Sequence, residues 1–173
     1  MKKIFALLVL FALNSSIGYT QNADGDKSPA STKEEIKNEM KRNRRKSRIN
    51  GVYIPKDIDD AIVQLKKLSS DKSLTKFINA DEKIVAKKLH FGIGRWMIVN
   101  WNFYGGSRFE KVLRDLGLGH PDDMADFMII VFHRYLNNKD LDSQVLADEF
   151  RKKRLEIYKK KKRKVIGVIK KKK

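Results

Sequence analysis

The sequence contains no cysteine among its 173 residues. This absence excludes disulfide bonds, thiolate metal sites, a lipid-modified cysteine and a cysteine nucleophile. The sequence also lacks a run of about 20 apolar residues, the length that a membrane-spanning helix needs. It has no repeated alternation of valine, isoleucine or threonine with polar residues. We therefore predict a helical protein without a substantial sheet.

Motifs that mark nucleotide binding or acyl-enzyme chemistry are lacking as well. The glycine pairs Gly92-x-Gly94 and Gly105-Gly106 follow no predicted strand and precede no GK[ST] pair, so they are not phosphate loops. Ser107 lies outside a GxSxG context. No two histidines stand three or four residues apart, as a helical metal site would require; they are His90, His120 and His133. The sequence therefore predicts no catalytic residue, no metal and no cofactor.

What is present begins with an export signal at residues 1–20. A basic start (MKK) precedes an uninterrupted apolar run at 4–13, and small and polar residues follow it. This is the three-part layout of a secretory signal peptide. We expect cleavage before Gln21 and a periplasmic or extracellular protein. Export removes cytoplasmic ATP and most nucleic acid from the partners to consider.

Positive charge is abundant, and it is concentrated in two flanks. The chain carries 39 Lys and Arg against 21 Asp and Glu, a net charge of +18. Residues 151–173 alone carry +13 and residues 32–48 carry +5, whereas residues 49–150 carry −1. We divide the chain into a signal peptide (1–20), a basic and disordered linker (21–51), a helical domain (52–150) and a basic C-terminal helix or tail (151–173).

The N-terminal flank contains one helix signal. Thr32 and Glu35 have the spacing of a capping box, so a short helix is predicted to begin there. Its apolar face would consist of Ile36 and Met40 only, which is too little to dock firmly.

Hydrophobic periodicity predicts about five to six helices in the domain. Apolar residues at 57–69 recur at helical spacing, and shorter patterns follow at 74–78 and 81–89. Two glycines in the segment 90–94 favour a bend there. Ser107 and Glu110 have capping-box spacing at the start of a further helix.

The last two helices of the domain differ in character. Residues 127–132 are apolar on all sides, so their helix is expected at the centre of the core. The helix that begins near Leu141 continues into the basic tail.

A ligand site, if the domain has one, is predicted in the aromatic-rich segment near Trp96–Tyr104. Aromatic side chains commonly line ligand pockets, and core packing is the alternative use for them. The candidate residues are His90, Arg95, Trp96, Asn100 and Trp101.

The basic tail is the second candidate site, and we predict that it binds a polyanion. Tyr158 is the only aromatic residue beyond Phe150, so base stacking is poorly supported and nucleic acid is not the expected partner. Anionic lipid or envelope polysaccharide suits an exported protein better. The candidate residues are Lys159, Lys160, Lys161, Lys162, Arg163 and Lys164.

The order and spacing of five short motifs give the chain a family resemblance. They are Ile54-Pro55-x-Asp57-x-x-x-Ala61, His90-Phe91-Gly92-x-Gly94-x-Trp96, Asn100-Trp101, Gly106-Ser107-Arg108 and His120-Pro121-Asp122-Asp123-Met124. Together they resemble an uncharacterised bacterial domain of unknown function that occurs in exported proteins. The resemblance implies a domain boundary and helical content, and it brings no activity, cofactor or substrate with it.

Three functional hypotheses follow. The leading one is a non-enzymatic interaction module of the cell envelope, attached by residues 151–173, whose neutral domain contacts an unknown protein partner. The first alternative is a small helical hydrolase or lyase that uses His90, Arg95 or Asp122, and these side chains would have to converge on one open cleft. The second is a helical antagonist of a secreted protein, which would need an exposed apolar patch of a few hundred Å².

Overall fold

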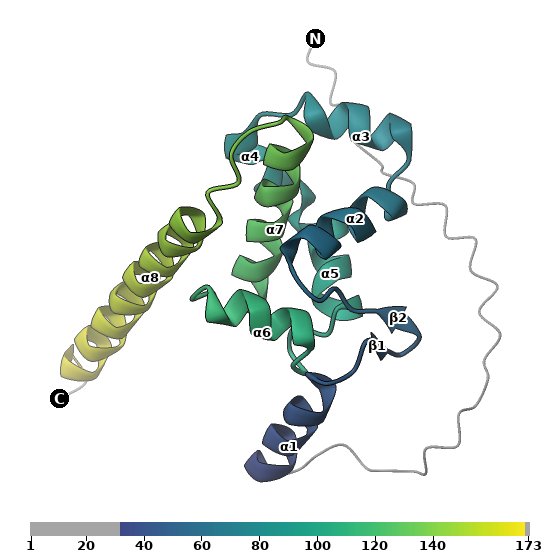
Figure 1. The fold of residues 1–173 in the computed structure, drawn as a ribbon. Coiled ribbons are helices and arrows are strands. Elements are labelled where there is room, and N and C mark those ends of the chain that lie inside the picture. Colours follow the sequence, from purple (N-terminus) through teal and green to yellow (C-terminus); the bar gives the residue numbers. More distant parts are fainter. Residues whose placement is uncertain (1–31, 172–173) are drawn as a thin grey trace.

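The computed structural model describes residues 32–171, and within them the chain is mostly helical (Figure 1). The elements are α1 Lys33–Asn43, β1 Arg48–Ile49, β2 Val52–Tyr53, α2 Ile58–Leu68, α3 Asp71–Ile78, α4 Glu82–Leu89, the π-helix η1 His90–Gly94, α5 Arg95–Asn100, α6 Arg108–Asp115, α7 Pro121–Leu136 and α8 Ser143–Lys171. The all-α prediction is confirmed. The predicted signal peptide at 1–20 lies outside the described residues.

Helix α7 is the centre of the body, as its apolar sequence predicts. Phe127, Met128 and Ile129 are each at most 1% exposed, and Val131 is fully buried. Helices α2, α3, α4, α5 and α8 and the π-helix all pack against α7, which Figure 1 shows in the middle of the molecule. A helix that is apolar on all sides needs partners on all sides, and α7 has them.

Local caps begin several of the helices. The Asp57 carboxylate accepts a hydrogen bond from the Asp60 N–H at 2.8 Å, which starts α2. The predicted capping box at α1 is present, because Thr32 and Glu35 each accept a hydrogen bond from the other's backbone N–H. The box predicted at α6 forms only by half. Ser107 Oγ accepts from the Glu110 N–H at 3.1 Å, whereas the Glu110 carboxylate turns to arginines elsewhere.

Helix α1 and strand β1 lie in the segment that the sequence analysis assigned to a linker. The last turn of α1 contacts the body: Asn43 Nδ2 donates to the Gly105 carbonyl oxygen at 3.1 Å, and Arg44 pairs with Glu110 at 3.2 Å. Gly106 makes this approach feasible, because its φ of +72° favours glycine and a Cβ there would lie 2.9 Å from the Met40 Cβ. Polar contacts and close backbone approach thus replace the apolar face that α1 lacks.

A two-residue antiparallel hairpin connects α1 to the helical domain. Arg48 pairs with Tyr53 and Ile49 with Val52. The turn between the strands is Asn50-Gly51, and both residues have positive φ (49° and 78°), as a tight hairpin turn requires. The expectation of no sheet therefore holds for the domain at large but misses this short pair of strands.

The segment 90–94 is not the bend that its glycines suggested. It is a π-helix that joins α4 directly to α5. Gly94 is buried against α7, and a Cβ there would lie 3.3 Å from the Ile129 Cδ1. Glycine at this position allows the π-helix and α7 to pack closely. Close packing of this kind does not require the chain to bend.

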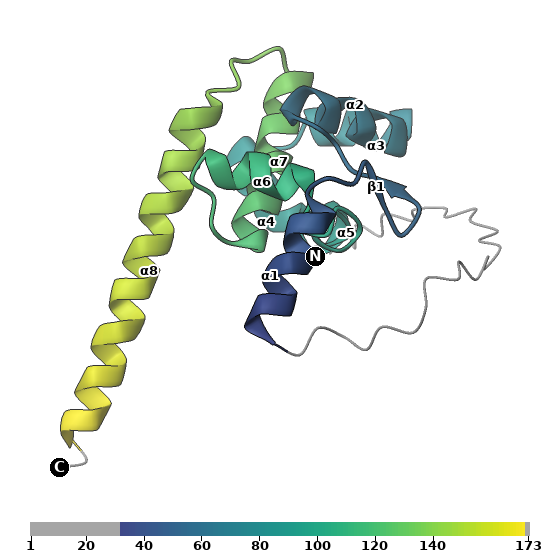
Figure 2. The same ribbon diagram turned by 60° about the horizontal axis from the view of Figure 1, so that its bottom comes forward.

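Helix α8 packs on α7 through its first half and then extends away from the body (Figure 2). Of its residues up to Lys164, the buried apolar ones are Leu146 and Ala147. Within the residues that the structure describes, no helix is long and apolar enough to cross a membrane.

Candidate functional site

The five candidate ligand residues fall into different environments. Trp101 is 1% exposed, and its ring packs edge-to-face on Trp96 and Phe109, with centroids at 5.8 and 5.3 Å. Asn100 donates from Nδ2 to the Trp96 carbonyl oxygen at 2.9 Å. Arg95 is exposed. The structure thus brings Trp96, Asn100 and Trp101 together around a packed aromatic core, and ligand binding by these residues stays a prediction.

His90, the fifth candidate, makes a separate polar pair. Its Nδ1 lies 2.7 Å from Asp126 Oδ1, which joins the π-helix to α7. Its ring contacts Phe91 edge-on, and the Phe91 side chain is 86% exposed. A π-helical turn is often found at functional sites, and here it places an apolar ring in solvent beside a histidine–carboxylate pair.

The three residues of the hydrolase hypothesis belong to different helices of the described structure and do not contact one another through hydrogen bonds there. Asp122 lies at the start of α7, 43% exposed, with its Oδ2 3.5 Å from His120 Nδ1. His120 is the N-cap of that helix and accepts from the Asp122 N–H at 3.2 Å. In the described part of the chain, no hydrogen bond joins any two of His90, Arg95 and Asp122. General acid–base catalysis would need such groups within reach of one substrate position.

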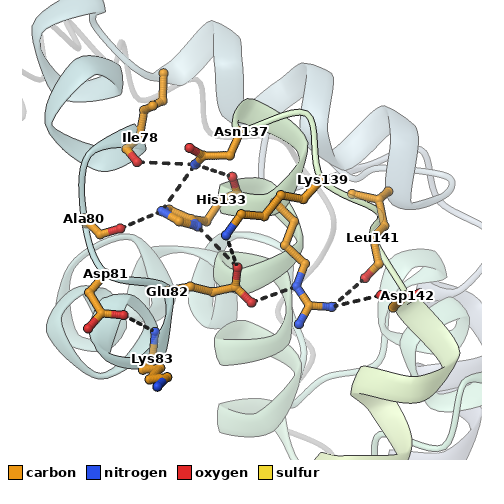
Figure 3. Close-up of polar contacts among 11 residues, drawn as sticks. Ile78, Ala80, Asp81, Glu82, Lys83, His133, Asn137, Lys139, Leu141 and Asp142 are labelled. Carbon is orange, nitrogen blue, oxygen red and sulfur yellow. Dashed lines mark hydrogen bonds and ion pairs between the residues drawn. The ribbon is translucent and has the colours of Figure 1, made fainter.

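An open pocket of about 490 Å³ lies where α3, α4 and the end of α7 meet (Figure 3). Its lining combines carboxylates, amides, cations and one histidine, from Ile78, Asn79, Ala80, Asp81, Glu82, Lys83, His133, Asn137 and Lys139. Among the described residues there is no cluster of three or more histidines or carboxylates able to hold a metal ion.

His133 forms the wall of this pocket and is 2% exposed. Its Nε2 donates to the Ala80 carbonyl oxygen at 2.9 Å, which assigns the proton of a neutral ring to that nitrogen. Its Nδ1 is buried without a hydrogen-bond partner, 4.0 Å from Glu82 Oε2. Asn137 Nδ2 donates to the carbonyl oxygens of His133 and Ile78, so side chains of α7 hold the end of α3 and the loop after it.

Glu82 connects three elements through its carboxylate. Arg134 Nε donates to one oxygen at 2.9 Å and Lys139 Nζ donates to the other at 3.0 Å. Arg134 also donates to the Leu141 carbonyl oxygen at 3.1 Å. Burial by itself raises the pKa of Glu82, but the hydrogen bonds and charges of Lys139 and Arg134 outweigh burial and lower it. The arrangement ties the start of α4 to α7 and to the loop before α8.

This lowered pKa predicts how the pocket responds to acid. The unfolded chain protonates Glu82 near its usual pKa of 4.5, whereas the folded chain resists protonation. The free energy of unfolding therefore includes a stabilising contribution above that pH, which is lost as the pH falls through the lower folded pKa. In Glu82→Gln, we expect the free energy of unfolding to depend less on pH below about pH 5, measured by urea unfolding at several pH values.

The control for this experiment is Asp115→Asn. Asp115 forms an exposed ion pair with Lys111 on α6, with the carboxylate side chain 63% exposed. If Glu82→Gln and Asp115→Asn changed the pH dependence of the free energy of unfolding equally, the cations around Glu82 would contribute no more to stability than an exposed ion pair does.

The six polyanion candidates lie on the part of α8 that extends away from the body. Lys159 to Lys164 are all exposed, and no carboxylate of the described residues pairs with any of them. In contrast, Arg151 pairs with Asp148 at 2.9 Å on the same helix. The six candidates thus lie on the exposed end of α8, beyond its ion pairs.

Arg154 fastens α8 to the body just before these cations. It binds Asp123 of α7 with two hydrogen bonds, the one from Nε at 2.7 Å. The hydrogen bond to Asp123 raises the pKa of Arg154 and keeps the guanidinium charged, although partial burial opposes this. Bidentate pairing fixes direction as well as charge, so this contact orients the free end of α8.

The comparisons with known proteins concern the middle of the chain. Residues 54–136 match DUF6794, a domain of unknown function. The predicted resemblance to a domain of unknown function is confirmed. No curated protein and no solved structure matches the chain significantly.

The DUF6794 region contains the aromatic core, the His90–Asp126 pair and most of the pocket lining. Lys139 and helices α1 and α8 lie outside it. The candidate polyanion site therefore belongs to a flank of the DUF6794 region.

The pocket was not predicted from the sequence. Glu82, Arg134 and Lys139 were not singled out, because the partners of Glu82 lie 52 and 57 positions further along the chain. The only local signals were an acidic residue in the first turn of α4 and an arginine in the last turn of α7, which dipole interactions explain.

Proposed function

We propose that the protein is a non-enzymatic interaction module, exported to the periplasm or the cell exterior, whose basic helix attaches it to a polyanionic envelope surface. In this proposal the neutral body, which includes the DUF6794 region, is free to contact a protein partner. Anionic lipid and envelope polysaccharide are the candidate surfaces.

The observation that carries the proposal is the projecting end of α8. Its unpaired cations, Lys159–Lys164, lie next to one another on a helix with no acidic neighbour within ion-pair distance in the described structure. Six consecutive like charges on a helix repel one another at i,i+3 and i,i+4. A polyanion would relieve this repulsion, so binding would also stabilise the helix.

Helix α1 provides secondary support. Lys41, Arg42 and Arg45, together with Asn38, line a small pocket of about 270 Å³ that contains no carboxylate. Figures 1 and 2 place the free end of α1 and the free end of α8 on the same side of the body. One extended anionic surface could therefore meet both basic helices.

The test uses the protein after export by the expression host, so that its N-terminus is processed as in the cell. Mass spectrometry of that N-terminus checks the expected cut before Gln21. Binding is then measured by co-sedimentation with vesicles of phosphatidylglycerol and phosphatidylcholine, and with dextran sulfate as a soluble polyanion, at several salt concentrations.

We expect replacement of Lys159–Lys164 by glutamine to weaken binding at least about a hundredfold, because each basic residue near an anionic surface contributes about 1 kcal/mol. Binding of the unmodified protein should fall steeply between about 50 and 500 mM salt, since screening shortens electrostatic attraction.

The matched control replaces six exposed lysines of α2, α3 and α4 by glutamine, which removes the same charge. They are Lys67, Lys72, Lys76, Lys83, Lys87 and Lys88. If this control lost as much affinity as the α8 variant, net charge alone would explain binding and α8 would not be the site.

A further inference from the structure

The projecting half of α8 exposes apolar side chains among its cations. Leu155 is 51% exposed and Tyr158 is 65% exposed. They are three residues apart, so they lie on one face of the helix. Leu146, Ala147 and Arg154 pack on the body. Tyr158 is four residues beyond Arg154, so it continues this side of the helix past the end of the body. Leu155 and Tyr158 therefore form an exposed apolar strip that the body does not cover.

Lys162 extends this face by one further turn. It follows Tyr158 at an interval of four residues, after the interval of three from Leu155 to Tyr158. Alternating intervals of three and four are those of a helix with one continuous contact face. A second copy of this helix is a poor occupant of that face, because two sets of unpaired cations would be brought side by side.

The positive charge of the helix favours an anionic partner. The apolar strip favours an anionic partner that also has an apolar region. A sulfated or phosphorylated polysaccharide would neutralise Lys159–Lys164 but would leave Leu155 and Tyr158 in water. An anionic bilayer offers phosphate groups to the cations and an apolar layer directly beneath them. Tyrosine is favoured at this boundary, and a lysine within the strip can extend its ammonium group to the headgroups.

We propose that α8, beyond Arg154, lies along the surface of an anionic lipid bilayer, with Leu155 and Tyr158 inserted between the headgroups and the neighbouring lysines on lipid phosphates. This inference rests on the proposed function and narrows its polyanion to a bilayer. The ion pair of Arg154 with Asp123 then sets the angle between the membrane-bound helix and the body.

The first test separates apolar insertion from charge. The double variant Leu155→Ser/Tyr158→Ser keeps every cation of α8. We expect its affinity for phosphatidylglycerol-containing vesicles to fall about tenfold or more, because the variant has less apolar surface to bury in the bilayer. Its affinity for dextran sulfate should stay within about twofold. Val145→Ser, at a side chain 60% exposed near the start of α8, is the control and should leave both affinities unchanged.

The second test reports the position of the strip directly. In Tyr158→Trp, we expect a blue-shifted component of the emission on vesicle addition. We also expect more quenching by brominated lipid than in the unmodified protein, whose Trp101 is buried and whose Trp96 is partly buried. The matched position is Lys160→Trp, two residues further along and therefore on a different face of the helix, where quenching should be weaker.

The outcomes distinguish this inference from the proposed function. If the unmodified protein bound neither vesicles nor dextran sulfate, the proposed function would fail. If it bound both and the double variant kept full vesicle affinity, polyanion binding would stand and bilayer insertion would be wrong. Tighter binding to polyglutamate than to vesicles, lost in the double variant, would overturn the inference in favour of an acidic protein partner.

Discussion

Trp101→Ala is expected to lower the free energy of unfolding by about 4 kcal/mol, the largest effect that we predict for a single substitution. Trp101 is 1% exposed, and its ring contacts those of Trp96, Phe103 and Phe109, with centroids 5.3 to 6.3 Å away. Truncation removes the transfer free energy of a large side chain and leaves a cavity among rigid rings that cannot close around it.

Urea unfolding followed by circular dichroism at 222 nm measures this loss, since the substitution also removes a fluorophore. Tyr104→Ala is the control, three residues further along, because the Tyr104 side chain is 65% exposed. We expect Tyr104→Ala to change the free energy of unfolding by less than about 0.5 kcal/mol. Equal effects of the two variants would show that the aromatic cluster is not the core that holds α5 and α6 together.

The outcome at Trp101 also bears on the ligand prediction for the same segment. A side chain that is buried among other rings contributes to stability whether or not a ligand binds nearby. The aromatic composition of the segment indicated both uses, and only the tertiary contacts show which of its rings are in the core. Phe91, Arg95 and Tyr104 are exposed, and sequence composition did not separate them from Trp101.

Helix positions were predictable because their signals are local. The expected helix at 57–69 is α2, Ile58–Leu68, and its aspartate cap at position 57 is formed. Residues 127–132 are apolar on all sides, which placed α7 at the centre without knowledge of its neighbours. Periodicity and capping depend on residues within about one helical turn of each other, so a single sequence contains them in full.

One local feature was missed and another was interpreted wrongly, both for physical reasons. Asn50-Gly51 is a strong hairpin signal, but the flanking strands are two residues long, too short to produce an alternating pattern. The glycines at 92 and 94 suggested a bend, whereas Gly94 lies in a π-helix where a larger residue would press on Ile129. Glycine allows both sharp turns and close packing, and spacing alone does not distinguish them.

The basic helix could be predicted from the sequence as a candidate site, and the pocket could not. Lys159–Lys164 could be singled out from composition, because consecutive cations need no partner to be recognised. The pocket around Glu82 depends on Arg134 and His133, which approach it only after α4 has packed on α7. Long-range pairs of this kind leave no trace in the spacing of residues.

Glu110→Ala is expected to lower the free energy of unfolding by about 3 kcal/mol, the second largest effect that we predict. The Glu110 side chain is fully buried and lies between two arginines, with Arg44 Nη2 at 3.2 Å and Arg114 Nε at 2.6 Å. Truncation leaves a cavity in place of the carboxylate and removes the ion-pair partner of two partly exposed guanidinium groups, 32% exposed at Arg44 and 44% at Arg114. Arg44 would lose its one hydrogen bond to a carboxylate. Its Nε is already buried without a partner, so the loss adds to an existing deficit.

The matched control is Asp115→Ala on the same helix. Asp115 pairs with Lys111 at i,i+4, but both side chains are more than half exposed, so we expect less than about 0.5 kcal/mol. Because Glu110 also holds α1, amide hydrogen exchange in 33–43 should accelerate in Glu110→Ala and stay unchanged in Asp115→Ala. A double-mutant cycle with Arg44→Ala gives the coupling directly, and a coupling near zero would mean that α1 is held by Asn43 and the approach at Gly106 alone.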